Sequence, residues 1–156
     1  MTVELRRLGP DDATVLERVA EDVFDGPVVL ALGREFLDDP RHHLIVALDD
    51  GVVVGMITAV DYVHPDKPAQ LWINEVGVAP SHKRQGIGRA LLRAMLEHGR
   101  RCGCTEAWLG TEPDNLAARG LYEDGGGKAE PFILYSFDLT HDDSQPAASQ
   151  QALRVP

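Results

Sequence analysis

The residues with the clearest potential for chemistry are glycines and basic side chains gathered in one run, at positions 76–92. Val76 and Val78 continue an apolar stretch typical of a strand, which stops at Pro80. A basic turn with two glycines follows, and apolar residues then recur at helical spacing from Ile87 onward. A strand that enters a helix through such a turn points several backbone N–H groups and the positive end of the helix dipole at one spot. The run therefore predicts a binding site for a pyrophosphate group.

Two common phosphate-binding loops do not fit this run. A P-loop requires Lys-Ser or Lys-Thr at its end, and no such pair follows Gly86 or Gly88. The dinucleotide fingerprint requires a third glycine three residues after Gly88, where this chain has Leu91. The remaining pattern, Lys-Arg-Gln-Gly-Ile-Gly at 83–88, resembles the Gln/Arg-x-x-Gly-x-Gly/Ala signature of the GNAT acyltransferases.

A second run extends this resemblance to about residues 3–139. Residues 115–122, Asn-Leu-Ala-Ala-Arg-Gly-Leu-Tyr, are similar to the second motif of the family, Asn-x-x-Ala-x-x-x-Tyr, and stand in the family's order. The chain departs from the pattern at Lys83, where Gln or Arg is usual, at Gly127, where an aromatic is usual, and at Gly120 inside a helix. None of these departures removes a reacting group. The resemblance implies an N-acetyltransferase with a mixed, mainly antiparallel sheet flanked by helices.

The resemblance also implies that acetyl-CoA is the cofactor and that it lies along the first motif. The backbone of residues 76–78 is expected to pair with the amides of the pantetheine arm, as an added strand would, and Gly77 would permit the bulge that this needs. Asn115 could bond the same arm or simply cap its helix. The cofactor-binding residues expected on this basis are Val76, Gly77, Val78, Lys83, Arg84, Gln85, Gly86, Ile87, Gly88, Arg89, Asn115, Ala118 and Tyr122.

Two side chains are the candidates for moving protons. Glu75 is a charged residue within an apolar strand, where partial burial would raise its pKa and suit it to bind or deprotonate an amine. The alternative is a carboxylate at a strand edge that faces solvent. For Tyr122 the resemblance implies a general acid toward the leaving thiolate, since phenol and thiol pKa values are close, at about 10 and 8.5. The alternative is an aromatic ring that packs against the sheet.

Acidic residues dominate the segment that would face the second substrate. Residues 21–39 contain six carboxylates and one basic residue, Arg34, and in GNAT folds the first two helices usually wall the acceptor cleft. This favours a cationic small-molecule amine as acceptor, although ordinary solvated helix faces would look the same. Residues 59–68 and 72–76, with the basic turn, also resemble type I aminoglycoside 3-N-acetyltransferases. An aminoglycoside is therefore the favoured acceptor. The alternatives are a protein, peptide or small-metabolite amine, or a CoA-binding module without catalysis.

Length, charge and cysteine content bound the class of protein. The chain has 156 residues, enough for one domain with a core, a net charge of −10, and no apolar run approaching a membrane span. The charge argues against a nucleic-acid partner, and the start of the chain lacks the order of a signal peptide, so we expect a cytoplasmic protein without membrane contact. Cys102 and Cys104 are the only cysteines, and the histidines at 42, 43, 64, 82, 98 and 141 lack metal-ligand spacing, so no metal site is expected.

The hydrophobic pattern predicts the elements that would position these residues. Strands are expected at 3–7, 43–48, 52–63, 70–79, 105–110 and 131–139, and helices from residue 10 to the Gly-Pro break at 26, at 28–37, at 85–101 and at 114–123. The Asp-Gly pair at 50–51 predicts a hairpin turn. We expect one domain over residues 1–139 and a polar, flexible tail over 140–156. The last strand could pair across the interface of a homodimer.

Overall fold

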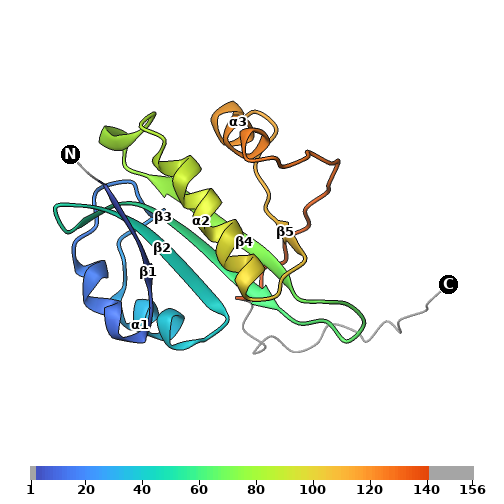
Figure 1. Ribbon diagram of the computed structural model, residues 1–156, viewed down its shortest axis with the longest axis horizontal. Helices are drawn as coiled ribbons and strands as arrows, with labels where there is room; N and C mark the ends of the chain where they lie inside the picture. Colours follow the sequence, from blue (N-terminus) through green and yellow to red (C-terminus); the bar gives the residue numbers. More distant parts are fainter. Residues whose placement is uncertain (1–2, 141–156) are drawn as a thin grey trace.

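The structure is a computed structural model that describes residues 3–140 of the chain (Figure 1). The strands are β1 Glu4–Leu8, β2 His42–Asp49, β3 Val52–Tyr62, β4 Gln70–Val78 and β5 Glu106–Trp108. The α-helices are α1 Leu30–Asp38, α2 Ile87–Arg101 and α3 Leu116–Asp124, and two short 3₁₀ helices are η1 Pro10–Glu17 and η2 Pro80–His82. The predicted tail lies almost wholly outside the described residues.

The strands form one sheet in the order β1-β2-β3-β4-β5. Neighbours from β1 to β4 are antiparallel, and β5 is parallel to β4, so the expected mixed and mainly antiparallel sheet is confirmed. The β2–β3 hairpin turns through Asp50 and Gly51, both with positive φ (48° and 72°), the conformation that makes Asp-Gly a strong hairpin signal.

The helices cover the sheet on both faces. A Cβ built on Gly55 of β3 would contact Ile87 and Leu91 of α2. Gly77 of β4 is the neighbour of Val78, which pairs with Gly55, and a Cβ built on Gly77 would instead meet Val23. Since successive residues of a strand face opposite sides, α2 lies on one face and the segment around Val23, with η1 and α1, on the other. The central strands between these layers are apolar and almost fully buried, as in the β3 residues Val53 and Ile57.

The helix predicted from residue 10 to residue 25 is correct only at its start. The helical segment η1 ends at Glu17, and the backbone then joins the sheet: Val53 N–H donates to Arg18 O (2.8 Å) and Ala20 N–H donates to Val53 O (2.9 Å). The apolar spacing at Val19 and Val23 resembles a helix face, but backbone hydrogen bonds to β3 hold this segment in another conformation.

The strand predicted at 131–139 does not form. Residues 127–140 leave α3 as an extended segment without sheet pairing in the described chain (Figure 1). Its large apolar side chains are 71–90% exposed. The prediction was wrong for a single chain because β-type residues need a neighbouring strand, and no strand of residues 3–140 lies beside this segment.

No helix among residues 3–140 is long and apolar enough to cross a membrane.

Candidate active site

The sheet splits open between β4 and β5. β5 pairs with β4 only from Gln70 to Trp72, so the rest of β4 has no strand on that side within the described chain. Ala79 N–H donates to Val54 O of β3 (2.9 Å), and peptide groups alternate along a strand. The N–H and C=O groups of Val76 and Val78 therefore face the open edge. A ligand with an extended chain of amides could add to this edge as a strand does.

Gly77 does not form the bulge expected of it but allows close packing of another backbone segment. The sequence predicted a bulge at Gly77, but the pairing register shifts at Asn74, which lies unpaired between Ile73 and Glu75. A glycine is instead required here because the segment around Val23 crosses β4 in close contact with its backbone: a Cβ built on Gly77 would lie 1.9 Å from Val23 O. Because Glu75 and Gly77 are two residues apart, the Glu75 side chain points to the same face as the Val23 segment.

The glycine turn leads into the start of α2, where backbone N–H groups are left without partners in the helix. Arg84 and Gly86 both adopt left-handed backbone conformations (φ 62° and 81°), and Gly86 is the N-cap of α2. No side chain caps this helix, and its first backbone bond runs from Ala90 N to Gly86 O, so the N–H groups of residues 87–89 lack partners within the helix. Nothing lies within 4 Å of a Cβ built on Gly86. An anion can therefore approach these donors closely.

Some side chains of the turn extend into solvent, and one bonds to the backbone of the loop. Lys83 and Arg84 are exposed beside the open donors, where they would attract an anion. The Gln85 amide donates to Ser81 O (3.3 Å) and so supports the loop. The positive potential of the turn thus comes from backbone groups together with two free-standing basic side chains.

The start of α2 also anchors α3. Ile87 is 6% exposed, so its side chain packs in the core and only its N–H is available to a ligand. A Cβ on Gly88 would be 3.4 Å from Leu121 of α3, and Arg89 Nη2 lies 2.6 Å from Asp124 Oδ2. These contacts bring the second motif beside the first, although they tie the Arg89 side chain to α3.

In the second motif, Asn115 caps its helix and Tyr122 is partly buried. Asn115 Oδ1 accepts a hydrogen bond from Ala118 N–H (3.2 Å), which matches the capping alternative and leaves the Asn115 amide N–H groups for a ligand. Burial raises the pKa of the Tyr122 phenol, so it keeps its proton well above neutral pH. A protonated phenol at this place can act as a proton donor.

Glu75 has the chemistry of a corresponding proton acceptor. It is partly buried, and burial raises the pKa of its carboxyl above the ordinary value, with the nearby carboxylate of Asp25 adding to the effect. A carboxylate with a raised pKa is a stronger base, and two carboxylates together attract a cation. The sequence did not single out Asp25 among the acids of 21–39, because only the crossing at Val23 brings it near Glu75.

The chain shares sequence with acetyltransferases of several kinds. The family model "Acetyltransferase (GNAT) family" matches residues 14–126. Aminoglycoside N(6')-acetyltransferase type 1 of Salmonella typhimurium is 29% identical over 111 residues, which cover 68% of this chain and 77% of that protein. N-alpha-acetyltransferase RimI of Mycobacterium tuberculosis is 32% identical over 96 residues, 62% of this chain and 58% of that protein.

Solved structures agree in fold. An aminoglycoside acetyltransferase from an uncultured soil metagenomic sample superposes with a TM-score of 0.76 at 22% identity, covering 90% of this chain and all of that one. Aminoglycoside N-acetyltransferase AAC(6')-Iy, solved in complex with CoA, gives a TM-score of 0.72 at 21% identity over 88% of this chain and 95% of that one. Since the family model covers well over half of the sequence, this chain belongs to the GNAT family of acetyltransferases.

Proposed function

We propose that this enzyme transfers the acetyl group of acetyl-CoA directly to a primary amine of a cationic small molecule, with an aminoglycoside as the favoured acceptor. The observation that carries the proposal is the position of the partly buried Glu75, which adjoins the open edge of β4 at Val76 and points to the face crossed by the acidic segment around Val23. The names of the aminoglycoside-modifying relatives support it. Those relatives are of the 6′-N type, whereas the narrower likeness in the sequence is to the 3-N type, so the modified amine is left to experiment.

The donor side of the site fits acetyl-CoA, which supplies an acetyl group already activated as a thioester. The free peptide groups of Val76 and Val78 would hold the amides of its extended arm. The unpartnered N–H groups of residues 87–89 would bind its diphosphate, aided by Lys83 and Arg84. The N–H groups of the Asn115 amide would add a further bond.

On the acceptor side, the carboxylates have complementary roles. Glu75 would first attract an ammonium group and then accept its proton, directly or through water, so that the amine can attack. Asp25, which is exposed, would hold a second ammonium of a polyamine. Tyr122 would donate its proton to the departing sulfur, and the raised pKa keeps that proton available.

Acceptor screening is the direct test. The full chain is incubated with acetyl-CoA and kanamycin- or gentamicin-type amines, spermidine, or peptides with free N-termini and lysines, while released thiol is measured. Product mass confirms the acetyl transfer, and NMR of the product locates the modified nitrogen. Turnover of peptides without turnover of aminoglycosides would show the favoured acceptor to be wrong. CoA binding without any turnover would point to the non-catalytic alternative.

We also propose that two copies associate through residues 131–139. Ile133, Tyr135, Phe137 and Leu139 alternate along the segment and are all exposed, as is Trp108 on the open edge of β5. On this face Tyr135 and Phe137 can bury about 150–250 Å² each, and Ile133 and Leu139 add further apolar area, so two copies would approach the lower range of a specific interface, roughly 1,200 Å². A second copy therefore supplies the missing neighbouring strand.

Sedimentation of the full chain tests this association. We expect a dimer that Phe137→Asp converts to a monomer, while Ser136→Asp, on the other side of the same segment, stays dimeric. A monomeric wild-type chain would refute the dimer. Neither Cys102 nor Cys104 forms a disulfide, which supports, as a further proposal, a location in the cytoplasm.

A further inference from the structure

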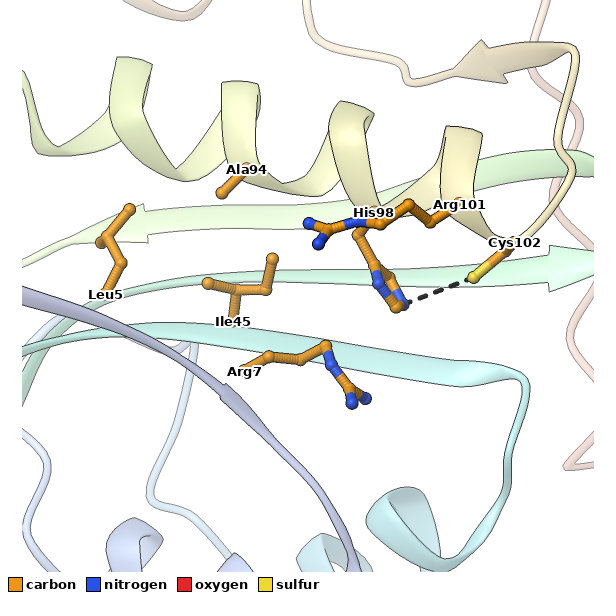
Figure 2. Close-up of a pocket in the computed structure, with 7 residues that line it drawn as sticks. All are labelled: Leu5, Arg7, Ile45, Ala94, His98, Arg101 and Cys102. Atoms are coloured by element: carbon orange, nitrogen blue, oxygen red, sulfur yellow. Dashed lines mark hydrogen bonds between the residues drawn. The ribbon is translucent and has the colours of Figure 1, made fainter.

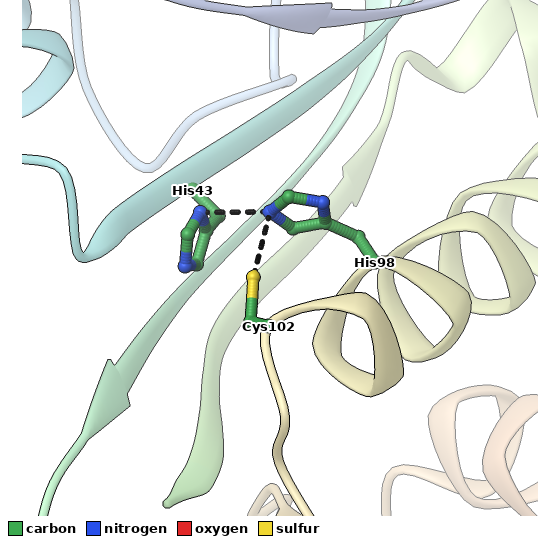
Figure 3. A group of neighbouring side chains, drawn as sticks. All are labelled: His43, His98 and Cys102. Carbon is green, nitrogen blue, oxygen red and sulfur yellow. Dashed lines mark hydrogen bonds between the residues drawn. The ribbon is translucent and has the colours of Figure 1, made fainter.

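A second group of reactive side chains lies at the far end of α2 from the glycine turn, about 22 Å along the helix at 1.5 Å per residue. His43 comes from β2, His98 from the last turn of α2, and Cys102 follows that helix directly (Figure 3). His98 Nε2 lies 2.9 Å from His43 Nδ1 and 3.5 Å from Cys102 Sγ. The three donor atoms all lie within 4.8 Å of one another, so they surround one point.

A carboxylate fixes the orientation of the most buried ligand. Asp61 Oδ1 lies 2.6 Å from His43 Nε2, and His43 is only 5% exposed. An ionised carboxylate only accepts hydrogen bonds, so we assign the His43 proton to Nε2. The lone pair on His43 Nδ1 then points toward His98. A carboxylate behind a ligating histidine is the usual outer partner in protein metal sites.

We propose that His43 Nδ1, His98 Nε2 and Cys102 Sγ bind a divalent transition-metal ion of the zinc class. Zinc bonds of about 2.0–2.1 Å to nitrogen and 2.3 Å to sulfur, in a tetrahedron, place donor atoms roughly 3.3–3.6 Å apart. The 2.9 Å separation needs to open by a few tenths of an ångström and the 3.5 Å separation already fits, whereas the third, which is within 4.8 Å, needs to close by at most about 1.2 Å. Two imidazoles and one thiolate suit zinc among the common divalent ions, and a water would complete the tetrahedron.

The charge and proton balance of this site are satisfied. Binding displaces the Cys102 thiol proton to solvent, and the His98 proton moves from Nε2 to Nδ1, so one proton is released per ion. The thiolate and the Asp61 carboxylate together neutralise the two positive charges of the metal.

An open pocket of about 470 Å³ gives an ion access to His98 and Cys102 (Figure 2). Its lining includes His98 and Cys102, with the guanidinium groups of Arg7 and Arg101 and a floor that includes Ile45. The positive charges of the two arginines disfavour an ion that would leave the site with a net positive charge. The site therefore favours an ion whose charge the thiolate and Asp61 can cancel. Bound there, the metal would link the end of α2 to β2 and so stabilise the layer that carries the glycine turn.

Cobalt titration of the untagged full chain, stripped of metal and free of CoA and added thiols, tests this site. We expect one Co²⁺ per chain, with the charge-transfer absorption of a cobalt thiolate, and its loss when Zn²⁺ displaces the probe. Cys102→Ser should remove this absorption, and Asp61→Asn should weaken the affinity by about 10–100-fold, as loss of an outer partner does elsewhere. Cys104→Ser is the matched control and should titrate like the wild type.

Thermal unfolding provides a second readout. Zn²⁺ should raise the Tm of the wild type and of Cys104→Ser, because an ion that binds only the folded state stabilises it, but not that of Cys102→Ser. A wild-type chain with no cobalt–thiolate absorption would overturn the proposal. Absorption that survives Cys102→Ser, or that disappears in Cys104→Ser, would equally overturn it. None of these measurements depends on the identity of the amine acceptor.

Discussion

Gly77→Ala is expected to damage both the stability and the acceptor site of this enzyme. The added methyl group would lie 1.9 Å from Val23 O, more than 1 Å inside any normal contact, and the obstructing atom belongs to the backbone. No side-chain rotation can relieve such a clash. Either the Val23 segment or β4 must therefore move.

The cost follows from what each movement disrupts. Val23 is 2% exposed, and full burial of a valine side chain is worth about 1.5–3 kcal/mol. Lifting the segment sacrifices much of that burial, while bending β4 weakens its pairing with β3. We therefore expect a loss of about 2–3 kcal/mol in the free energy of unfolding, or a fall of about 4–12 °C in Tm for a domain of this size. The displaced segment also carries Asp25 away from Glu75, so KM for the amine should rise while Kd for CoA changes little.

Urea unfolding and steady-state kinetics check these expectations. Gly26→Ala is the matched control, because Gly26 lies three residues further along the same segment and a Cβ there meets nothing within 4 Å. That variant should unfold within about 0.5 kcal/mol of the wild type, as surface substitutions usually do. If Gly77→Ala matched the control in both stability and KM, the crossing would not hold the acceptor side in place.

The further predictions concern three residues: Gly86 in the proposed CoA site, and Glu75 and Tyr122 as the proposed reacting groups. Gly86→Val should weaken CoA binding at least tenfold while the domain stays folded, because a branched side chain at φ 81° costs about 1–2 kcal/mol and covers the open donors; calorimetry measures this. For Glu75, kcat/KM should fall as the pH drops through its raised pKa, and Asp25→Asn should move that limb to lower pH. Glu75→Gln should lower kcat. Because a carboxyl group with a raised pKa destabilises the folded state once it ionises, the same variant should be more stable than the wild type at pH 7. This gain in stability should fade toward pH 4.5 and below, where the carboxyl is protonated in both the folded and the unfolded state. Tyr122→Phe should lower kcat by about 10²–10⁴-fold with CoA affinity retained, as loss of a general acid does; a change of only a few-fold would exclude that role.

Most elements were predictable because their signals are local. The Asp-Gly hairpin, the apolar central strands and the glycine turn before α2 each depend on residues that are adjacent in the sequence. The two errors have a common cause. Residues 18–25 have helical spacing but bond to β3, and residues 131–139 have a strand composition but no strand beside them in one chain. The first outcome depends on a partner that is distant in sequence, and the second on a neighbouring strand that residues 3–140 do not supply.

The sites divide in the same way. Motif spacing predicted the backbone donors at the start of α2, because they depend on one turn. It could not predict the role of Gly77, which follows from a crossing by a segment 54 positions earlier. The proximity of the histidine and cysteine side chains was missed because they come from separate elements. The one local signal was the spacing of four between His98 and Cys102, which places both on one side of a helix end.

The distribution of charge supports the proposal that the diphosphate of acetyl-CoA binds at the start of α2. Helix starts normally carry acidic residues or a capping side chain, yet the first turn of α2 has neither, and three basic residues surround it in a chain of net charge −10. Asp124 neutralises Arg89, but Lys83 and Arg84 have no such counterpart among the ion pairs of residues 3–140. This arrangement destabilises the empty enzyme locally, because cations face the positive end of a helix dipole. An anionic diphosphate would reverse the sign of that interaction, so the same residues that weaken the free helix start would strengthen the complex.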